Sequence, residues 1–294
     1  MSIYQTLLEI GLTSAKTSSF FRKGVRDNPN IDVYRDKSSG VIFIKDHYVG
    51  DEEYQSGDYR KEKAVKGGKG LSVRSYELEN DCDRRVKDFS PFYVGKDIAD
   101  FGSGHGDFLY ATNHLTKSSV GIELQINFVE ELNSNGIRCE ESLGSIDNKS
   151  IDTFFLFHSF EHLPDPLSIL EEIKSKLRMK GKIVIEVPHA NDFLISTLKE
   201  ESFIEFTLWS QHLILHTEHS LRRFLEYAGF QNILIKGIQR YPLSNHLQWI
   251  SKKRPGGHQS NLALLDTESL SEAYSSALSR IGANDTLVAI ADLN

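Results

Sequence analysis

Cysteine is nearly absent from this chain of 294 residues, which contains only Cys82 and Cys139. Two thiols cannot build a disulfide framework or a four-thiolate zinc site, so we expect both to be reduced and structural. Long apolar runs are also missing, because no segment has the roughly 18 consecutive apolar residues of a membrane-spanning helix. The N-terminus lacks the basic start and apolar run of a secretory signal. These absences predict a cytoplasmic protein without stable membrane insertion.

An excess of positive charge is missing as well. The chain has 34 lysine and arginine residues against 41 aspartate and glutamate residues, which gives a net charge of −7. Nucleic-acid-binding domains usually carry a basic surface, so we predict no nucleic-acid partner. The 39% hydrophobic content is enough for one large core with appendages or for two modest cores. Nothing in the composition indicates an oligomeric state.

The first part of the chain, residues 1–94, is irregular in pattern and is predicted to be an N-terminal extension. The segment VYRDKSSGVIFI, residues 33–44, predicts a β-hairpin with its turn at Ser38, Ser39 and Gly40. A basic run follows at residues 60–74 and is typical of a solvated linker. A lid that binds an acidic substrate is the alternative for this run.

From residue 95 onward, short apolar runs alternate with helical periodicity, which is typical of parallel βαβ units. One helix is expected to begin at the Asp165 cap and Pro166 and to end at Gly181, a second to run from Ser220 to Gly229, and a third over Glu268–Ile281. The 45 residues 241–285 form an unusually long connection, which predicts a substrate-facing cap. The expected strands are Ile98–Gly102, Ser119–Leu124, Ile137–Glu141, Ile151–Phe157, Lys182–Val187, Asn232–Arg240 and Thr286–Ala291.

The segment DIADFGSGHGDFL, residues 97–109, leads from a strand through Gly102, Gly104 and Gly106 into a helix. Glycines allow a tight turn and a close approach of a ligand to the backbone at the helix N-terminus. Glu123 ends the next strand, where a carboxylate can accept hydrogen bonds from two ribose hydroxyls. A glycine turn alone could be a plain strand-to-helix connection, but its combination with Glu123 predicts a nucleotide-type cofactor.

This glycine segment resembles motif I of class I methyltransferases, because Asp100 lies two residues before the first glycine and the spacing is G-x-G-x-G. FLFHSFEHLPDP (155–166), IEVPHAN (185–191) and HLILHTEHSLRRFLEYAGF (212–230) resemble, in the same order, segments of the Methyltransf_23-like family. The resemblance covers roughly residues 95–240. Residues 239–258 are further similar to members from bacterial surface-polysaccharide biosynthesis.

The resemblance implies a Rossmann-like methyltransferase domain over residues 95–294, with seven mostly parallel strands, the last one antiparallel, and helices on both sides. It implies S-adenosylmethionine as cofactor and a sugar or sugar-derived acceptor from capsule or lipopolysaccharide synthesis. The adenine is expected near Glu141 and Ser142. The residues implied to bind the rest of the cofactor are Asp100, Phe101, Gly102, Ser103, Gly104 and Gly106 at the methionine part, Glu123 and Leu124 at the ribose, and His158 and Ser159 at the sulfonium.

Relatives with sugar substrates often carry an N-terminal zinc ribbon where this chain has the hairpin of residues 33–44. The metal-binding cysteines are absent here, so the hairpin is interpreted as a degenerate ribbon and no structural zinc is predicted.

Six of the eleven histidines follow the fourth and fifth expected strands. Methyl transfer is an in-line displacement, so the protein must align the reactants and, for a hydroxyl or amine acceptor, remove a proton. His189, His212 and His162 are the candidate bases, and for His162 the alternative is that it packs under the following helix and orients the loop. His216 and His219 are expected to be capping or surface residues. A metal site built from His158, Glu161 and His162 is an alternative, but we predict no metal.

Two other functions remain open from the sequence. A non-catalytic domain could keep the S-adenosylmethionine site without transferring a methyl group. A nicotinamide-dependent oxidoreductase would use the same glycine turn and Glu123, but the glycine spacing and the lack of an evident Tyr-x-x-x-Lys pair disfavour it. The patterns do not distinguish methylation of oxygen, nitrogen or carbon.

Overall fold

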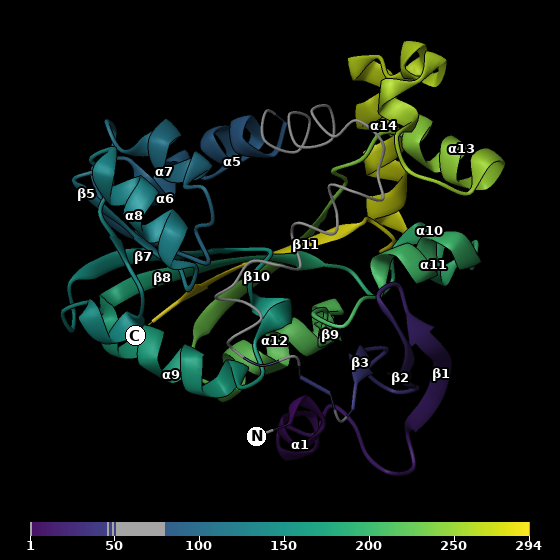
Figure 1. Cartoon of the computed structure of the whole chain (residues 1–294), viewed down its shortest axis with the longest axis horizontal. Coiled ribbons are helices and arrows are strands. Elements are labelled where there is room, and N and C mark those ends of the chain that lie inside the picture. The colour runs from purple at the N-terminus through teal and green to yellow at the C-terminus, as the bar shows by residue number, and fades with distance from the viewer. Residues whose placement is uncertain (1, 46, 49, 51–79, 294) are drawn as a thin grey trace.

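The computed structural model describes residues 2–45, 47, 48, 50 and 80–293 (Figure 1). The basic run at residues 60–74 lies outside the described residues, so both interpretations of it remain predictions.

The centre of the molecule is a seven-stranded sheet in the order β10-β11-β8-β7-β4-β5-β6. Strands β4 to β8 run parallel, whereas β11 is antiparallel to both of its neighbours. Phe154, Phe155 and Leu156 are fully buried in succession, as expected for a strand covered on both faces. The predicted sheet with an antiparallel last strand is therefore confirmed. Its strands are β4 (Asp97–Phe101), β5 (Ser118–Ile122), β6 (Cys139–Glu140), β7 (Ile151–Phe157), β8 (Leu177–Pro188), β10 (Gln231–Ile238) and β11 (Thr286–Asp292).

Helices cover both faces of this sheet (Figure 1). One hydrophobic cluster joins the sheet to α9 and α12 through Leu170, Ile173 and Phe224, together with α1. A second cluster on the other face is built around Phe108 and Leu132 of α7 and α8. The helices of the two layers are α1 (Ile3–Glu9), α5 (Cys82–Asp88), α6 (Ser90–Tyr93), α7 (Asp107–Thr112), α8 (Ile126–Ser134), α9 (Pro166–Lys176) and α12 (Glu218–Tyr227).

The prediction that the helix after β7 ends at Gly181 is wrong. Helix α9 ends at Lys176, and Leu177 is already extended and pairs with Ile151. Gly181 lies inside β8, in a stretch where the register with β7 shifts. A Cβ on Gly181 would lie 2.8 Å from the Arg178 carbonyl oxygen. This glycine therefore makes room for an irregular stretch of β8 and does not end a helix.

Other boundaries also differ from expectation, among them the start of β8, which lies at Leu177 instead of Lys182. The third strand is limited to Cys139–Glu140, shorter than the expected Ile137–Glu141. Helix α12 starts at Glu218 instead of Ser220, because the Thr217 side chain caps it by accepting a hydrogen bond from the backbone N–H of Ser220.

A second, antiparallel sheet stands beside the large one, with strands in the order β1-β2-β3-β9. The predicted hairpin of residues 33–44 is confirmed, because Val33 pairs with Ile44 and Arg35 with Ile42. The fourth strand of this sheet, β9, comes from the C-terminal part of the chain and pairs with β3. This pairing joins the N-terminal segment to the large domain. The strands are β1 (Ser18–Val25), β2 (Asn28–Asp36), β3 (Ile42–Ile44) and β9 (Ile214–Leu215).

Residues 241–285 fold into a helical lobe between β10 and β11, drawn in yellow-green at the upper right of Figure 1. His246 of the lobe stacks on Phe193, and Lys253 forms an ion pair with Glu200. The lobe therefore packs on α10 (Phe193–Ser196) and α11 (Glu201–Thr207). It contains α13 (Leu243–Lys252), the 3₁₀ turns η4 (Gly257–Gln259) and η5 (Asn261–Leu265), and α14 (Glu268–Arg280). No helix in the described part of the chain has the length and apolarity needed to cross a membrane.

Candidate functional site

The carboxyl ends of β4, β5, β7 and β8 meet at one edge of the large sheet, and the turn after β4 has an unusual backbone there. Gly102, Gly104 and Gly106 all have left-handed φ angles, of 76°, 57° and 75°. A Cβ at Gly102 would lie 2.7 Å from Ser159 Cβ, and one at Gly106 would lie 2.3 Å from Leu132 Cδ2. The turn therefore requires glycine for both conformation and space, and it leaves bare backbone at the start of α7.

The side-chain carboxylate of Glu123 lies against this turn. Its Oε2 accepts a hydrogen bond from the backbone N–H of Gly104 at 2.8 Å, and its Oε1 accepts one from Gln125 at 3.0 Å. Glu123 is only 7% exposed, whereas the next residue, Leu124, is 45% exposed. The carboxylate is fixed in position, and each oxygen keeps a lone pair for a further donor.

Asp100 is a buried carboxyl group at the end of β4, with 4% of its surface exposed. Burial, followed by the nearby charges of Glu123 and Asp107, raises the pKa of Asp100 to about 7, although Arg85 opposes the shift. A cation placed beside it would stabilise its ionised form.

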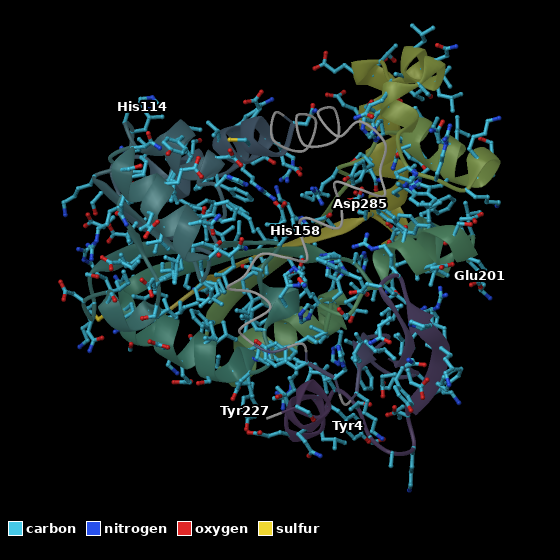
Figure 2. All side chains as sticks on the ribbon, viewed as in Figure 1. Tyr4, His114, His158, Glu201, Tyr227 and Asp285 are labelled. Carbon is cyan, nitrogen blue, oxygen red and sulfur yellow. The ribbon has the colours of Figure 1, made fainter. Side chains whose placement is uncertain are left out.

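His158 follows β7 directly and has a left-handed backbone, with a φ of 53°. Its Nδ1 lies 3.3 Å from Glu161 Oε1, and its Nε2 lies 3.3 Å from Glu186 Oε1. Neighbouring Ser159 donates a hydrogen bond through Oγ to the Phe101 carbonyl oxygen at 2.9 Å. The turn after β7 is thereby joined to the glycine turn after β4. Figure 2 shows His158 near the middle of the molecule, unlike His114 and Tyr227 at its periphery.

Beneath His158 lies a buried ionic network that the sequence patterns did not reveal. Fully buried Glu186 accepts hydrogen bonds from Arg84 at 2.9 and 3.0 Å and from Arg85 at 2.7 Å. Burial alone raises the pKa of Glu186, but Arg85, His158 and Arg84 hold it well below its usual range. Arg240, after β10, is paired with Asp81, just before α5. In the sequence, the adjacent residues Arg84 and Arg85 are the feature that could have indicated this network.

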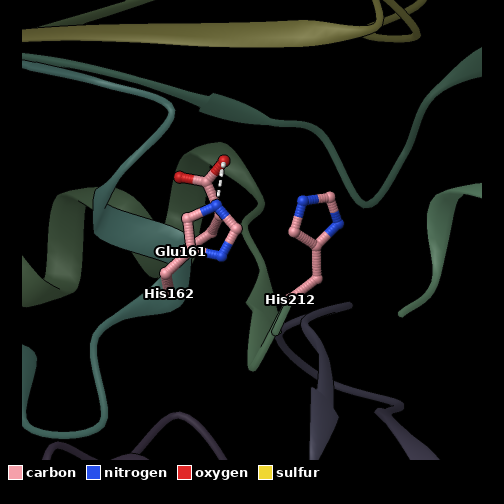
Figure 3. Close-up of side chains that lie close together, drawn as sticks. All are labelled: Glu161, His162 and His212. Atoms are coloured by element: carbon pink, nitrogen blue, oxygen red, sulfur yellow. Dashed lines mark ion pairs between the residues drawn. The ribbon is translucent and has the colours of Figure 1, made fainter. Parts of the chain in front are cut away.

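Glu161, His162 and His212 form a compact cluster next to this network (Figure 3). One ligand atom from each residue lies within 4.8 Å of those from the other two, and His162 Nε2 is 3.9 Å from Glu161 Oε1. Burial alone raises the pKa of Glu161, but the hydrogen bond from His158 and the nearby histidines lower it to about 2. Two predicted catalytic histidines are thus brought together by the fold.

His189 lies apart from that cluster. It is 3% exposed, its Nδ1 is bonded to the Asn284 carbonyl oxygen at 3.0 Å, and burial lowers its pKa to about 4. His189 forms an isolated β-bridge with His216. The expectation of a surface position for His216 is wrong, because it is fully buried and stacks on Phe160. It does lie at the helix cap, since it directly precedes the Thr217 cap of α12 and its Nδ1 is 3.2 Å from Ser220 Oγ. His219 is exposed, as expected.

The remaining predicted residues lie around the same edge. Ser103 Oγ is 3.9 Å from Sγ of Cys139, the first residue of the two-residue strand β6. Glu141 and Ser142 follow β6 and are exposed. The fold therefore brings the predicted cofactor residues to adjacent strand ends.

Comparison with known proteins found one matching family model and similar curated proteins. The model of the Methyltransf_23 family, described as a methyltransferase domain, matches residues 74–235. A tRNA U34 carboxymethyltransferase of Campylobacter hominis is 26% identical over 157 residues, which cover 49% of this chain and 54% of the relative. A ubiquinone biosynthesis O-methyltransferase of Cupriavidus pinatubonensis is 24% identical over 165 residues, which cover 51% of this chain and 66% of the relative. The matches thus span between about half and two thirds of these relatives.

Solved structures share the fold. A SAM-dependent methyltransferase from Archaeoglobus fulgidus aligns with a TM-score of 0.51 at 19% identity, covering 75% of this chain and 99% of that one. A SAM-dependent methyltransferase from Thermotoga maritima, described as a possible histamine N-methyltransferase, aligns with a TM-score of 0.52 at 12% identity, covering 83% and 99%.

Proposed function

This chain belongs to the Methyltransf_23 family of class I S-adenosylmethionine-dependent methyltransferases, and we propose that it transfers the cofactor's methyl group to a sugar or sugar-derived small molecule. The observation that carries the proposal is the joint position of Glu123 and the glycine turn. The carboxylate is held 2.8 Å from the Gly104 backbone at the carboxyl edge of the sheet. Cofactors of Rossmann-like folds bind at this edge.

The cofactor is proposed to lie across the ends of β4 and β5. Glu123 would accept hydrogen bonds from both ribose hydroxyls, because its two oxygens retain lone pairs, and Leu124 would border the ribose. The buried carboxyl group of Asp100 suits the positively charged methionine part. His158 and Ser159 would line the sulfonium, and Glu141 and Ser142 the adenine. Phe101, Gly102, Ser103, Gly104 and Gly106 would complete the methionine pocket.

The acceptor is proposed to bind under the helical lobe of residues 241–285. The chain leaves β10 and re-enters β11 at the same edge where β4, β5 and β7 end, so the lobe stands over the cofactor edge. Its base carries polar groups that suit a hydroxyl-rich ligand. Gln239 Nε2 donates to Asp285 Oδ2 at 2.9 Å, and His246 Nδ1 lies 2.6 Å from the Tyr274 hydroxyl. The sugar is proposed because, by the sequence analysis, residues 239–258 resemble proteins of surface-polysaccharide synthesis.

For removal of a proton from the acceptor, the pair His162 and His212 is a better candidate than His189. A general base works best with a pKa near the working pH. Burial lowers the pKa of His189 to about 4, so it would be a weak base. His162 and His212 are partly exposed, and their rings lie 5.1 Å apart. We propose that the Glu161, His162 and His212 cluster receives the acceptor's oxygen.

The test begins with isothermal titration of the purified chain with S-adenosylmethionine and S-adenosylhomocysteine, beside NADH. We expect micromolar binding of the sulfur cofactors that is lost in Glu123→Ala and Asp100→Ala. The matched control is Glu130→Ala, which removes an exposed carboxylate from α8. Well-folded protein that binds neither sulfur cofactor, or that prefers NADH, would contradict the proposal.

Transfer is then measured with radiolabelled S-adenosylmethionine and a panel of nucleotide-linked sugars. Labelled sugar product is the expected result, and it should fall strongly in His212→Ala. Cofactor binding without transfer to any acceptor would favour a non-catalytic binding domain.

A further inference from the structure

We propose that Glu161, His162 and His212 form a binding site for a divalent first-row transition-metal ion. Two imidazoles and one carboxylate are a ligand set found in catalytic zinc sites and in non-haem iron sites with open coordination positions. The segments that supply them are 50 residues apart in sequence and meet only in the fold.

The separation of the three ligand atoms suits one ion. Each pair lies within 4.8 Å, and the centre of an equilateral triangle of that side is about 2.8 Å from its corners. Metal–nitrogen and metal–oxygen bonds of about 2.0–2.2 Å then require each ligand atom to move inward by about 0.6–0.8 Å. Rotation about side-chain bonds supplies such a movement without a change in the backbone.

The tautomers of both histidines are set for binding. His162 Nδ1 lies 2.7 Å from the Gln211 carbonyl oxygen, and His212 Nδ1 lies 2.8 Å from the Thr207 carbonyl oxygen. A carbonyl oxygen only accepts, so Nδ1 must carry the hydrogen in each ring, and Nε2 carries the lone pair. Metal-binding histidines usually have this hydrogen bond from the nitrogen that does not bind the metal.

The backbone fixes the two segments against each other. The N–H of Leu213, next to His212, donates to the Glu161 carbonyl oxygen at 3.1 Å. Trp209 packs edge-on to both imidazoles, with centroid distances of 6.0 Å to His162 and 5.3 Å to His212. Glu161 is fully buried, and among the described residues its Oε2 has no hydrogen-bond partner. A buried carboxylate oxygen of this kind is stabilised by a cation.

The sequence predicts no metal and gives a site with His158 only as the alternative, whereas the set proposed here does not contain His158. Its Nδ1 faces Glu161 and its Nε2 faces Glu186, so both ring nitrogens are directed at carboxylates. Among the residues that the structure describes, His212 from the distant segment is the third member of the cluster.

In the methyl transfer proposed above, on which this role depends, the ion would bind the acceptor's oxygen and favour loss of its proton. With the ion bound, the Nε2 lone pairs of His162 and His212 are occupied, so the ion would replace these histidines as the group that promotes loss of the proton. Binding of the ion itself does not depend on that reaction. The glycine turn and the turn that carries Glu161 are in contact through Gly102 and Ser159, so the site borders the proposed cofactor region.

Titration with Co²⁺ tests the site. The 294-residue chain is first freed of any affinity tag and dialysed against a chelator to remove bound metal. We expect one Co²⁺ per chain, with a visible d–d absorption band that is displaced by Zn²⁺. His162→Ala and His212→Ala should each weaken binding by more than about 100-fold, because loss of even an outer hydrogen-bond partner typically costs about 10–100-fold. His219→Ala removes an exposed histidine seven residues from His212 and should bind as the wild type does.

Thermal unfolding and S-adenosylhomocysteine titration of every variant show whether it is folded. Folded wild type that binds no Co²⁺, or folded variants that retain wild-type affinity, would overturn the metal site while leaving the cofactor proposal intact. If Glu123→Ala loses cofactor binding but still binds Co²⁺, the metal site does not depend on the cofactor site.

Discussion

The buried network around Glu186 provides the sharpest test of how this site is held in place. Glu186→Gln keeps the shape of the side chain but removes the negative charge that faces Arg84, Arg85 and His158. Loss of one partner from a buried ion pair costs about 3–5 kcal/mol, because a buried charge is left without compensation. The two arginine side chains are still 20% and 16% exposed, so water can solvate part of the remaining charge. We therefore expect a loss near the lower end, about 3 kcal/mol.

Urea denaturation followed by circular dichroism measures this change in the free energy of unfolding. The control is Lys253→Gln, which breaks the ion pair with Glu200. Because Lys253 is 57% exposed, this substitution should lower the free energy of unfolding by less than about 1 kcal/mol. A loss in Glu186→Gln no larger than in the control, with an unchanged denaturant slope, would refute the reasoning.

The same network has a consequence for acid stability. The pKa of Glu186 is depressed in the folded protein, so its contribution is present above the pKa of an unfolded glutamate, about 4.3, and is lost as pH falls through the lower folded value. Wild-type stability should decline below about pH 4 more steeply than that of Glu186→Gln.

Two further predictions concern the proposed cofactor site. Because the pKa of Asp100 is about 7 and the ionised form suits a cationic ligand, S-adenosylmethionine should bind roughly eightfold more weakly at pH 6 than at pH 7.5. In calorimetric titration at high protein concentration, Asp100→Asn should bind weakly and equally at both pH values. An equal pH dependence in that variant would assign it to another group. Gly106→Ala should destabilise the protein by more than about 2 kcal/mol in urea denaturation, since it adds a clash with Leu132 to the cost of a left-handed φ. Gly136→Ala has a similar φ of 78° but no atom within 4 Å, so it should cost only about 1 kcal/mol; equal losses would contradict the role of the clash.

Much of the fold follows from local patterns. Buried β-strands of a parallel sheet are continuous apolar runs, so Ile151–Phe157 could be placed to the residue. Helix α9 starts where the Asp165 cap and Pro166 indicate. Its end was misplaced, because Gly181 marks a strand irregularity whose cause is the register of β8 on β7. A single glycine does not reveal which neighbour it accommodates.

The cofactor edge could also be predicted from sequence, since motif spacing and chain order place Asp100, the glycine turn and Glu123 at neighbouring strand ends. Parallel strands joined by right-handed connections leave few other arrangements. The pairing of β9 with the N-terminal hairpin could not be foreseen, because a two-residue strand has no periodicity to detect.

What the sequence determined by itself was therefore the class of fold, the family and the residues that end adjacent strands at the edge where the cofactor is proposed to bind, all of which depend on local spacing. Only the tertiary structure decided which histidines meet. His212 joins Glu161 and His162 because the segment before β9 folds back onto the turn after β7, while His216 is buried against Phe160 and His189 is directed to Asn284. Contacts between segments far apart in the chain depend on packing, and packing has no signature within either segment alone.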